Sequence, residues 1–274
     1  YIASPNSYHA EQAIMMLNTK KHVICEKPIA SNVKEFLQMK DAAVKNRVLL
    51  MEAYKSSTMP TMKAIKENIR KLGKIRSVFI SFGKYSSRYD AHKEGKNVNT
   101  FKAEFSNGAL MDLGVYCIYP IVTFFGMPTE IKAVSQILDG GVDGVGTILM
   151  KYDGFVATAD YCKISDSFLP CQITGEDATM IIDKISIPER IEIRYRDKTR
   201  PTEIITPEQR ADSMVYEIEE FTDCIRNGKT ESEINTFDLS EKVLTITDEA
   251  RRQCGIVFPA DLYDSHIEIV NSYK

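Results

Sequence analysis

Apolar and polar residues follow two different periods in the first 55 residues of the chain. Short apolar runs at 1–4, 22–25 and 47–54 have the length and composition of β-strands. The segments between them, 10–17 and 33–44, carry apolar residues at helical spacing. Strands that alternate with helices through short links form parallel sheets with helices on their faces. This part of the chain is therefore predicted to belong to a doubly wound parallel sheet.

The two predicted helices have recognisable start signals. Asn6 or Ser7 is available to cap the first helix, and Asn32 with Glu35 three residues later resembles a capping box. Apolar residues three and four positions apart define one face of each helix. These residues are Ala10, Ala13, Ile14 and Leu17 in the first helix, and Val33, Phe36, Leu37 and Val44 in the second. Both faces are expected to be buried.

A further helix and a series of short strands follow. Pro60 opens the helix and Gly73 ends it. Its apolar side consists of Met62, Ile65, Ile69 and Leu72. The β-like runs that follow lie at 75–82, 129–138, 146–152, 154–161, 171–175 and 179–183. Several of them are too close together for helical crossovers, so they are expected to pair antiparallel.

Two amphipathic helices are predicted towards the end of the sequence, at 213–226 and 238–253. Asp238 with Glu241 gives the second helix a start signal, and Gly255 ends it. The residues of the first helix expected to point inward are Met214, Ile218, Phe221 and Ile225.

The change of pattern near 55–60 predicts a domain boundary. Residues 1–57 are assigned to the C-terminal part of a Rossmann dinucleotide-binding domain, and residues 58–274 to a substrate-binding and oligomerisation domain. The last helices have room to pack back on the first domain. The fold class is α/β plus α+β: a partial Rossmann sheet followed by a large, open, mainly antiparallel sheet flanked by helices.

Composition and charge argue against several classes of protein. The net charge of −3 does not suggest binding to nucleic acid or to a membrane surface. No apolar stretch is expected to approach the ~20 residues of a membrane span. The segment 1–12 lacks the features of a signal peptide and an initiator Met, so a processed, truncated or partial protein is expected.

The six cysteines and four histidines are dispersed, without a C-x-x-C pair. A structural metal site needs clustered ligands, so none is expected. Free, separate thiols suit a reducing cytoplasm, which is the predicted location.

Polar residues stand where the predicted parallel strands end. "SPN" at 4–6, "EKP" at 26–28 and "EAY" at 52–54 all follow apolar runs. Ligands of such sheets bind beyond the carboxyl ends of the strands, so Glu26 and Lys27 would lie at a ligand edge. Pro28 fixes the chain behind them, and its peptide bond can be cis. Taken alone, "EKP" is more often a surface ion pair before a turn.

A mostly apolar helix at 108–126 carries a polar stripe. Its polar residues are Asp112, Tyr116, Tyr119 and Thr123, at spacings of four, three and four. A carboxylate on such a helix needs partners. Either the stripe faces a polar cavity or another subunit, or Asp112 makes a buried hydrogen bond and the tyrosines pack; the pattern alone does not separate these.

The run "GGVDGVG" at 140–146 resembles a phosphate-binding loop. A dinucleotide fingerprint must open a helix, whereas the residues after this run read as strand, turn and strand. A hairpin is therefore predicted.

Four segments together resemble one protein family. "SPNSYHAEQA", "HVICEKPIA", "MEAY" and "NGALMDLGVYCI", in this order and at these intervals, are similar to the glucose–fructose oxidoreductase/inositol dehydrogenase (Gfo/Idh/MocA) family. The resemblance extends over essentially the whole chain. A tyrosine in "DLGVYC", where many relatives carry histidine, resembles the branch of dihydrodiol dehydrogenase, xylose dehydrogenase and glucose–fructose oxidoreductase.

The resemblance implies an NAD- or NADP-dependent oxidoreductase that acts on sugars, polyols or related diols. It implies that Lys27 contacts both the nicotinamide ribose and the substrate, that Tyr116 donates and accepts the proton, and that Asp112 positions the substrate hydroxyl. The residues implied to line the cofactor are Ser4, Pro5, Asn6, His9, Glu26, Lys27 and Pro28. The implied partners are a small carbohydrate-like substrate and a second copy of the chain, bound through the antiparallel sheet, with no nucleic acid and no membrane.

These roles are chemically coherent. A free tyrosine has a pKa of ~10, too high for a good base at neutral pH. A nearby ammonium favours the phenolate, so Lys27 is expected to lower the pKa of Tyr116. The two side chains would then act as one acid–base unit.

The family pattern begins with a Gly-rich turn that has no counterpart here, so the sequence is interpreted as starting at the fourth Rossmann strand. At ~30 residues per βαβ unit, roughly 60–70 residues would precede it. Poor binding of NAD(P) by these 274 residues alone is therefore expected. The leading hypothesis is a dehydrogenase, and the alternative is a truncated, non-catalytic paralogue or association module.

Overall fold

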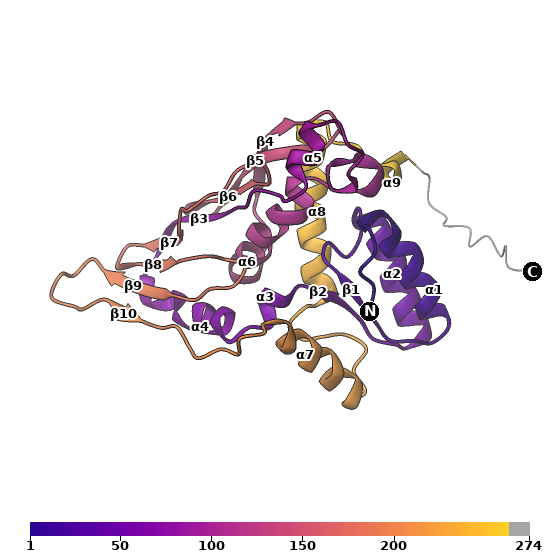
Figure 1. Cartoon of the computed structure of the whole chain (residues 1–274). Helices are drawn as coiled ribbons and strands as arrows, with labels where there is room; N and C mark the ends of the chain where they lie inside the picture. The colour runs from indigo at the N-terminus through magenta and orange to yellow at the C-terminus, as the bar shows by residue number, and fades with distance from the viewer. Residues whose placement is uncertain (263–274) are drawn as a thin grey trace, which may run out of the picture.

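The computed structural model describes residues 1–262, and its N-terminal part is a small parallel sheet between helices (Figure 1). The elements of this part are η1 (Asn6–Tyr8), α1 (His9–Asn18), β1 (Val23–Glu26), α2 (Val33–Asn46) and β2 (Leu50–Ala53). β1 and β2 pair in parallel, and Ile2 adds a parallel bridge to Cys25. Alternate residues of β1 face opposite sides, as in any strand. Val23 packs with α1 and α2, whereas Ile24 contacts Phe221 on the other face.

The larger part contains an eight-stranded sheet in the order β10-β9-β8-β7-β3-β6-β5-β4. The strands are β3 (Ile75–Gly83), β4 (Glu130–Ile137), β5 (Asp143–Tyr152), β6 (Phe155–Cys162), β7 (Cys171–Gly175), β8 (Ala178–Ile182), β9 (Ile191–Tyr195) and β10 (Glu203–Ile204). Only the β3–β6 pair is parallel among these, so the predicted, mainly antiparallel sheet is confirmed. The predicted hairpin after 140–146 is also confirmed, because β5 turns directly into β6.

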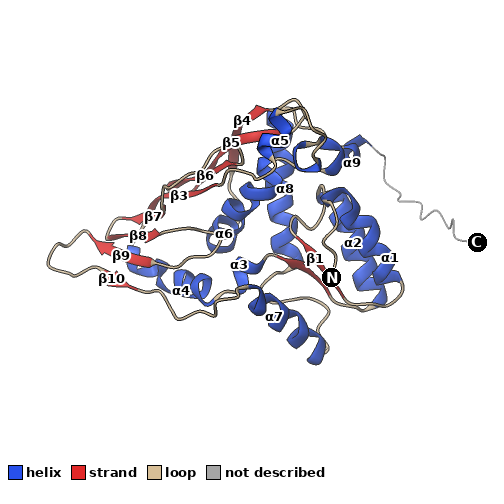
Figure 2. Ribbon diagram, in the orientation of Figure 1, coloured by secondary structure: helices blue, strands red, loops and turns tan. Residues whose placement is uncertain are grey.

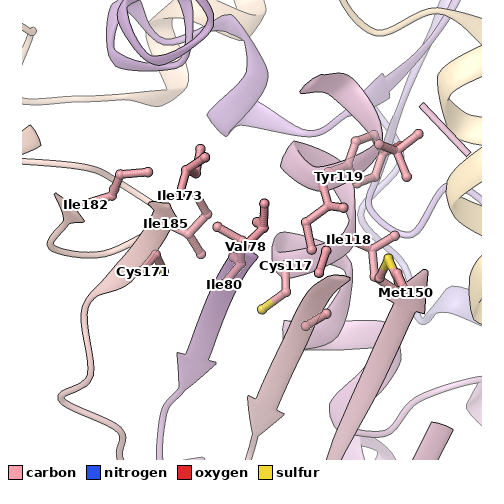
Figure 3. Close-up of a cluster of buried hydrophobic side chains, with 14 of the residues drawn as sticks. Val78, Ile80, Cys117, Ile118, Tyr119, Met150, Cys171, Ile173, Ile182 and Ile185 are labelled. Atoms are coloured by element: carbon pink, nitrogen blue, oxygen red, sulfur yellow. The ribbon is translucent and has the colours of Figure 1, made fainter. Parts of the chain in front are cut away.

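Helices cover one face of this sheet (Figure 2). α6 (Val115–Phe125) and α8 (Phe237–Cys254) are two of these helices. The other helices and helical turns after β2 are α3 (Lys55–Thr58), α4 (Pro60–Asn68), η2 (Ile69–Leu72), α5 (Tyr89–Lys93), η3 (Asn99–Phe101), η4 (Ala103–Phe105), η5 (Leu110–Gly114), α7 (Met214–Arg226) and α9 (Pro259–Leu262). Figure 3 shows the core between sheet and helix, where Val78 and Ile80 of β3 face Ile118 and Tyr119 of α6. The other face of the sheet carries no helix in the described part of the chain (Figure 1).

One helical stretch meets the length and composition of a membrane span. It is Ala103–Phe125, of 23 residues, so the expectation that no stretch approaches this length was wrong. In the described residues it is the only such helix, and 72% of its most apolar window is buried inside the fold. Its apolar side chains are those of a helix that packs in a protein core.

The predicted helix starts were correct in two cases of four. Pro60 is the first residue of α4. Asn32 caps α2 by accepting a hydrogen bond from the backbone N–H of Glu35, 2.9 Å away. α1 has no side-chain cap, because Asn6 lies in the preceding 3₁₀ turn and donates to another segment instead. α8 is capped by Thr236 rather than by Asp238.

Two predicted helix faces were partly wrong. Leu37 and Val44 of α2 are exposed, Val44 at 60%. Met214 and Ile218 of α7 are exposed as well, and the buried residues of α7 are Glu217 and Cys224. A helix that contacts a small sheet through a narrow stripe can leave further apolar residues in solvent. β9 and β10 were not predicted, although Ile191, Ile193 and Tyr195 alternate with charged residues as in a half-buried strand.

Candidate active site

The carboxyl end of β1 lies against the start of the α6 helix. β1 ends at Glu26, and the Lys27–Pro28 peptide bond that follows is cis. Lys27 Nζ donates to Asp112 Oδ1 at 2.8 Å and to the backbone carbonyl of Asp112 at 2.7 Å. Asp112 lies in the π-helical turn η5 that leads into α6. The two segments, far apart in sequence, are therefore joined at the edge of the parallel sheet.

Lys163 is a second cation on the same carboxylate. It directly follows β6, and its Nζ lies 2.6 Å from Asp112 Oδ2. The Lys163 residue is only 3% exposed, whereas the Asp112 side chain keeps 37% of its surface open. One carboxylate thus holds two ammonium groups. The sequence interpretation missed Lys163, although a lysine directly after a buried strand is the signal that identified Lys27.

Tyr116 lies one turn beyond Asp112 and completes the group. Lys27 Nζ is 4.8 Å from the centre of the Tyr116 ring. The ring is also held by Tyr54 and Phe82, each with its ring centre 5.4 Å away. The structure therefore brings the three predicted catalytic residues together in one place, as expected from their sequence positions.

These residues open onto a cavity of about 500 Å³. Its wall is formed by Lys27, Lys55, Phe82, Lys84, Tyr85, Ser86, Ser87, Asp112, Leu113, Tyr116, Lys163, Ser186 and Ile187. A pocket of this size is large enough for a small-molecule ligand. Tyr119 and Thr123, the other members of the predicted polar stripe, are absent from this wall.

Burial and neighbouring charges shift the pKa values of Asp112 and of the two lysines in opposite directions. Burial disfavours the charged form of Asp112, but Lys27 and Lys163 outweigh it and hold the pKa of the carboxyl below its usual range. Burial also opposes the charge of Lys27, but Asp112 outweighs it and raises the pKa of the ammonium. The pKa of Lys163 is lowered by its burial, against the effect of Asp112. Asp112 is therefore a fixed anion and not a general base near neutral pH.

The expected lowering of the Tyr116 pKa is not observed. Burial raises the pKa of Tyr116 above its usual value, and Lys27 offsets this only in part. The loss of solvation, which the sequence does not show, has a larger effect here than the neighbouring charge of Lys27. Tyr116 is consequently protonated at neutral pH.

The residues predicted to line the cofactor surround the same sheet edge, and several have protein partners. Ser4 Oγ donates to Gln12, and Asn6 Nδ2 donates to the carbonyl of Ser106 at 2.8 Å. Glu26 accepts a hydrogen bond from the hydroxyl of Tyr1. Direct contact of these residues with a cofactor stays a prediction.

His9 connects two of these segments. Its ring is fully buried, and its two nitrogens lie 2.9 Å from the carbonyls of Pro28 and Ser4. These contacts favour an indirect role, in which His9 fixes the loops after Ile2 and after β1. Pro5 and Pro28 shape the same two loops.

The segment "EAY" does not provide a ligand contact through Glu52. Glu52 is 3% exposed and accepts hydrogen bonds from Ser240, from Tyr119 and from the backbone of Ile29. Its carboxylate ties α6 and α8 to the parallel sheet. "EAY" does stand at the end of β2, as predicted, but Glu52 is used for the contacts between elements.

Family models match two consecutive parts of the chain. One, described as "Oxidoreductase family, NAD-binding Rossmann fold", matches residues 1–54, and the other, "GFO/IDH/MocA C-terminal domain", matches residues 62–181. The chain belongs to the Gfo/Idh/MocA oxidoreductase family. The predicted family, fold class and class of enzyme, an NAD(P)-dependent oxidoreductase, are confirmed. NAD and NADP are not separated, and the boundary near residue 57 stays a prediction.

Three relatives of this Gfo/Idh/MocA protein illustrate the match. A scyllo-inositol 2-dehydrogenase (NADP(+)), IolU of Bacillus subtilis, is 51% identical over 95% of this chain and 79% of its own. The uncharacterized oxidoreductase YgjR of Escherichia coli is 38% identical over 95% of this chain and 78% of its own. A trans-1,2-dihydrobenzene-1,2-diol dehydrogenase of Mus musculus is 30% identical over the same shares.

Solved structures show the same fold at low sequence identity. An aldose-aldose oxidoreductase from Caulobacter crescentus, complexed with glycerol, superposes with a TM-score of 0.80 at 22% identity, covering 93% of this chain and 76% of that one. A levoglucosan dehydrogenase in complex with NADH and levoglucosan superposes with a TM-score of 0.77 at 19% identity, covering 93% of this chain and 77% of that one.

The nicotinamide half of an NAD(P) molecule fits the residues at the sheet edge. Its ribose hydroxyls and carboxamide N–H groups are donors, and the edge offers carboxylate acceptors. Glu217 Oε2 of α7 is buried and has no hydrogen-bond partner among the described residues. Burial, with a smaller effect from Glu26, raises the Glu217 pKa to about 7. The sequence interpretation missed Glu217 because it was assigned to no face of its helix.

Proposed function

We propose that this protein interconverts a hydroxyl and a carbonyl group of a sugar, polyol or cyclic diol, with Tyr116 as the acid–base residue. The observation that carries the proposal is the position of Lys27, which contacts both Asp112 and the ring of Tyr116 at the wall of a cavity. Relatives named as inositol and dihydrobenzenediol dehydrogenases support a substrate with neighbouring hydroxyls. The family membership and the joint presence of these residues favour an enzyme over the non-catalytic alternative.

When NAD(P) is bound, its nicotinamide accepts or supplies the hydride. The protein then has to move one proton on the substrate oxygen. Tyr116 donates its hydroxyl proton to a carbonyl oxygen as that carbon gains hydride, or its phenolate takes the proton of the hydroxyl whose carbon loses hydride. Lys27 stabilises the phenolate, and Asp112 fixes Lys27. Lys27 and Glu26 would hold the ribose side of the cofactor.

The raised pKa of Tyr116 favours carbonyl reduction at neutral pH. Reduction needs the protonated form, which is fully present below the raised pKa and is lost only as pH rises through it. Oxidation needs the phenolate, whose fraction falls tenfold for each pH unit below the pKa. Because that pKa lies above the ordinary value of 10.0, Tyr116 stays protonated near neutral pH, and the rate of reduction should not vary with its titration there.

Initial rates should test this assignment in both directions. Purified protein that has first been shown to bind NADH or NADPH is expected to oxidise it in the presence of an inosose or a sugar ketone, with a rate insensitive to pH from about 6 to 9. With NAD⁺ or NADP⁺ and an inositol, the rate should rise across this range. A reduction rate that rises with pH, or no turnover with any polyol pair, would contradict the proposed function.

Self-association through the open sheet face is part of the proposal. Val134, Leu149 and Val156 are exposed on β4, β5 and β6, Val134 at 76%. Apolar residues on a face without a covering helix favour burial against a second copy, and a two-fold dimer is the commonest solution. Light scattering at micromolar concentration is expected to give a multiple of the chain mass, and Val134→Lys should reduce it. A monomer mass would rule this surface out. The cytoplasmic location stays a prediction.

A further inference from the structure

The cavity beside Tyr116 has a strongly positive wall. Four lysines line it, namely Lys27, Lys55, Lys84 and Lys163, and Asp112 is the one carboxylate among its lining residues. The formal charge of the lining is therefore +3, in a chain whose net charge is −3. Charge of one sign around a cleft with low-dielectric walls concentrates ligands of the opposite sign.

Hydrogen-bond donors also exceed acceptors in this cavity. The two carboxylate oxygens of Asp112 each already bind one ammonium, that of Lys27 or that of Lys163. An ammonium has three donors and no acceptor. Lys163 Nζ has no further hydrogen-bond acceptor in the described part of the chain, although its residue is nearly fully buried. A neutral polyol, whose hydroxyls donate as readily as they accept, would find few acceptors here.

The two remaining lysines are not neutralised by ion pairs. Lys55 begins α3, Lys84 follows β3, and neither forms an ion pair within residues 1–262. The acid that interacts with Lys55 is Glu217, which is only partly ionised at neutral pH because its pKa is about 7. The charge of Lys55 is therefore balanced in part, and that of Lys84 is not balanced by a contact.

We propose that the substrate of this site is an anionic polyol derivative, bound with a carboxylate or phosphate group on Lys55 and Lys84 and with its reacting carbon at Tyr116. This inference rests on the proposed function and specifies its substrate class. Lysine ammonium groups form charge-assisted hydrogen bonds to both anions, so the common chemistry is a negatively charged, acceptor-only group. The hydroxyl groups of Ser86, Ser87 and Ser186 remain available to the neutral part of the ligand.

Matched pairs of ligands test the inference. The pairs are myo-inositol with myo-inositol 1-phosphate, and D-glucose with D-glucuronate, so that phosphate and carboxylate are separate arms. Calorimetric titration of the full chain without cofactor gives the dissociation constants, and initial rates with NADP⁺ or NAD⁺ give kcat/KM. The anionic member of at least one pair is expected to bind ~10-fold more tightly or better, with an affinity that falls as salt is added.

Variants locate the effect. Lys55→Met with Lys84→Met should lower the affinity for the anionic member by ~10-fold and leave the neutral member within about threefold. Lys84→Arg keeps the positive charge and should retain the tighter binding of the anionic member. Lys66→Met, on an exposed position of α4, removes one charge elsewhere and serves as the matched control.

The outcomes separate this inference from the proposed function. Equal or tighter binding of the neutral members, or no binding of either anion at millimolar concentration, overturns the anionic substrate class. Equal losses for both members of a pair in the double variant would also overturn it. Tight anion binding without turnover, in protein that binds NADP⁺ or NAD⁺, would instead support the charged site and contradict the dehydrogenase assignment.

Discussion

Replacing Tyr116 by phenylalanine is expected to lower kcat by ~10²-fold or more in both directions of the reaction. The substitution removes the one hydroxyl placed to exchange a proton with the substrate oxygen. It keeps the ring, which packs against Tyr54 and Phe82 and under the ammonium of Lys27. The fold and the binding of substrate should therefore change little, so KM should shift far less than kcat.

Tyr89→Phe is a suitable control for this measurement. Tyr89 lies in α5 with its ring against Tyr85 and Phe101, and it does not line the cavity. Steady-state kinetics and a thermal melt of both variants distinguish loss of chemistry from loss of structure. Full activity in Tyr116→Phe would remove Tyr116 from the mechanism, and a loss of melting temperature in parallel with activity would indicate a packing role.

The position of the site could be predicted from the sequence because it depends on strand and helix periodicity. A strand end placed Lys27 at the ligand edge, and a helical spacing of four placed Asp112 and Tyr116 on one side of a helix. The electrostatic balance could not be predicted in the same way. The pKa of Tyr116 depends on how much water the folded protein removes, and the charge of Asp112 depends on Lys163, which arrives from a distant strand.

The buried faces of the helices could likewise be predicted only in part from the sequence. Periodicity identified apolar stripes on α2 and α7 but could not show how much of each stripe the small parallel sheet would cover. Val44 remains in solvent for this reason, and Glu217 is buried although Ile218 beside it is exposed. Glu52 is another case, because a carboxylate after an apolar run suits a ligand edge and a buried junction equally well. Only its contacts with Tyr119 and Ser240 decide between them.

Glu52→Ala is expected to be among the most destabilising single substitutions in this protein. The carboxylate of Glu52 accepts a hydrogen bond from Ser240 Oγ at 2.6 Å, from the backbone N–H of Ile29 at 3.0 Å and from the hydroxyl of Tyr119. Alanine would leave the backbone N–H of Ile29 buried without this acceptor and would leave the hydroxyls of Tyr119 and Ser240 only their contact with each other, at 3.3 Å. It would also open a cavity between β2, α6 and α8. The free energy of unfolding should fall by ~3–5 kcal/mol, because each cost is large and they add at one position.

Chemical denaturation and thermal melts of three variants would measure this effect. Glu52→Gln keeps the side-chain volume and one acceptor oxygen, so it should cost roughly half as much as Glu52→Ala. Glu67→Ala, on an exposed side of α4 with its side chain 61% open, should stay within ~0.5 kcal/mol of the parent. If Glu52→Ala were as stable as Glu67→Ala, the junction would not depend on this carboxylate. The substitution should also lower the activity. The ring centres of Tyr119 and Tyr54 are 3.9 Å apart, and Tyr54 in turn contacts Tyr116. A loss of activity in Glu52→Ala that Glu52→Gln largely restores would show that the hydrogen bonds of this buried side chain hold the acid–base tyrosine in place.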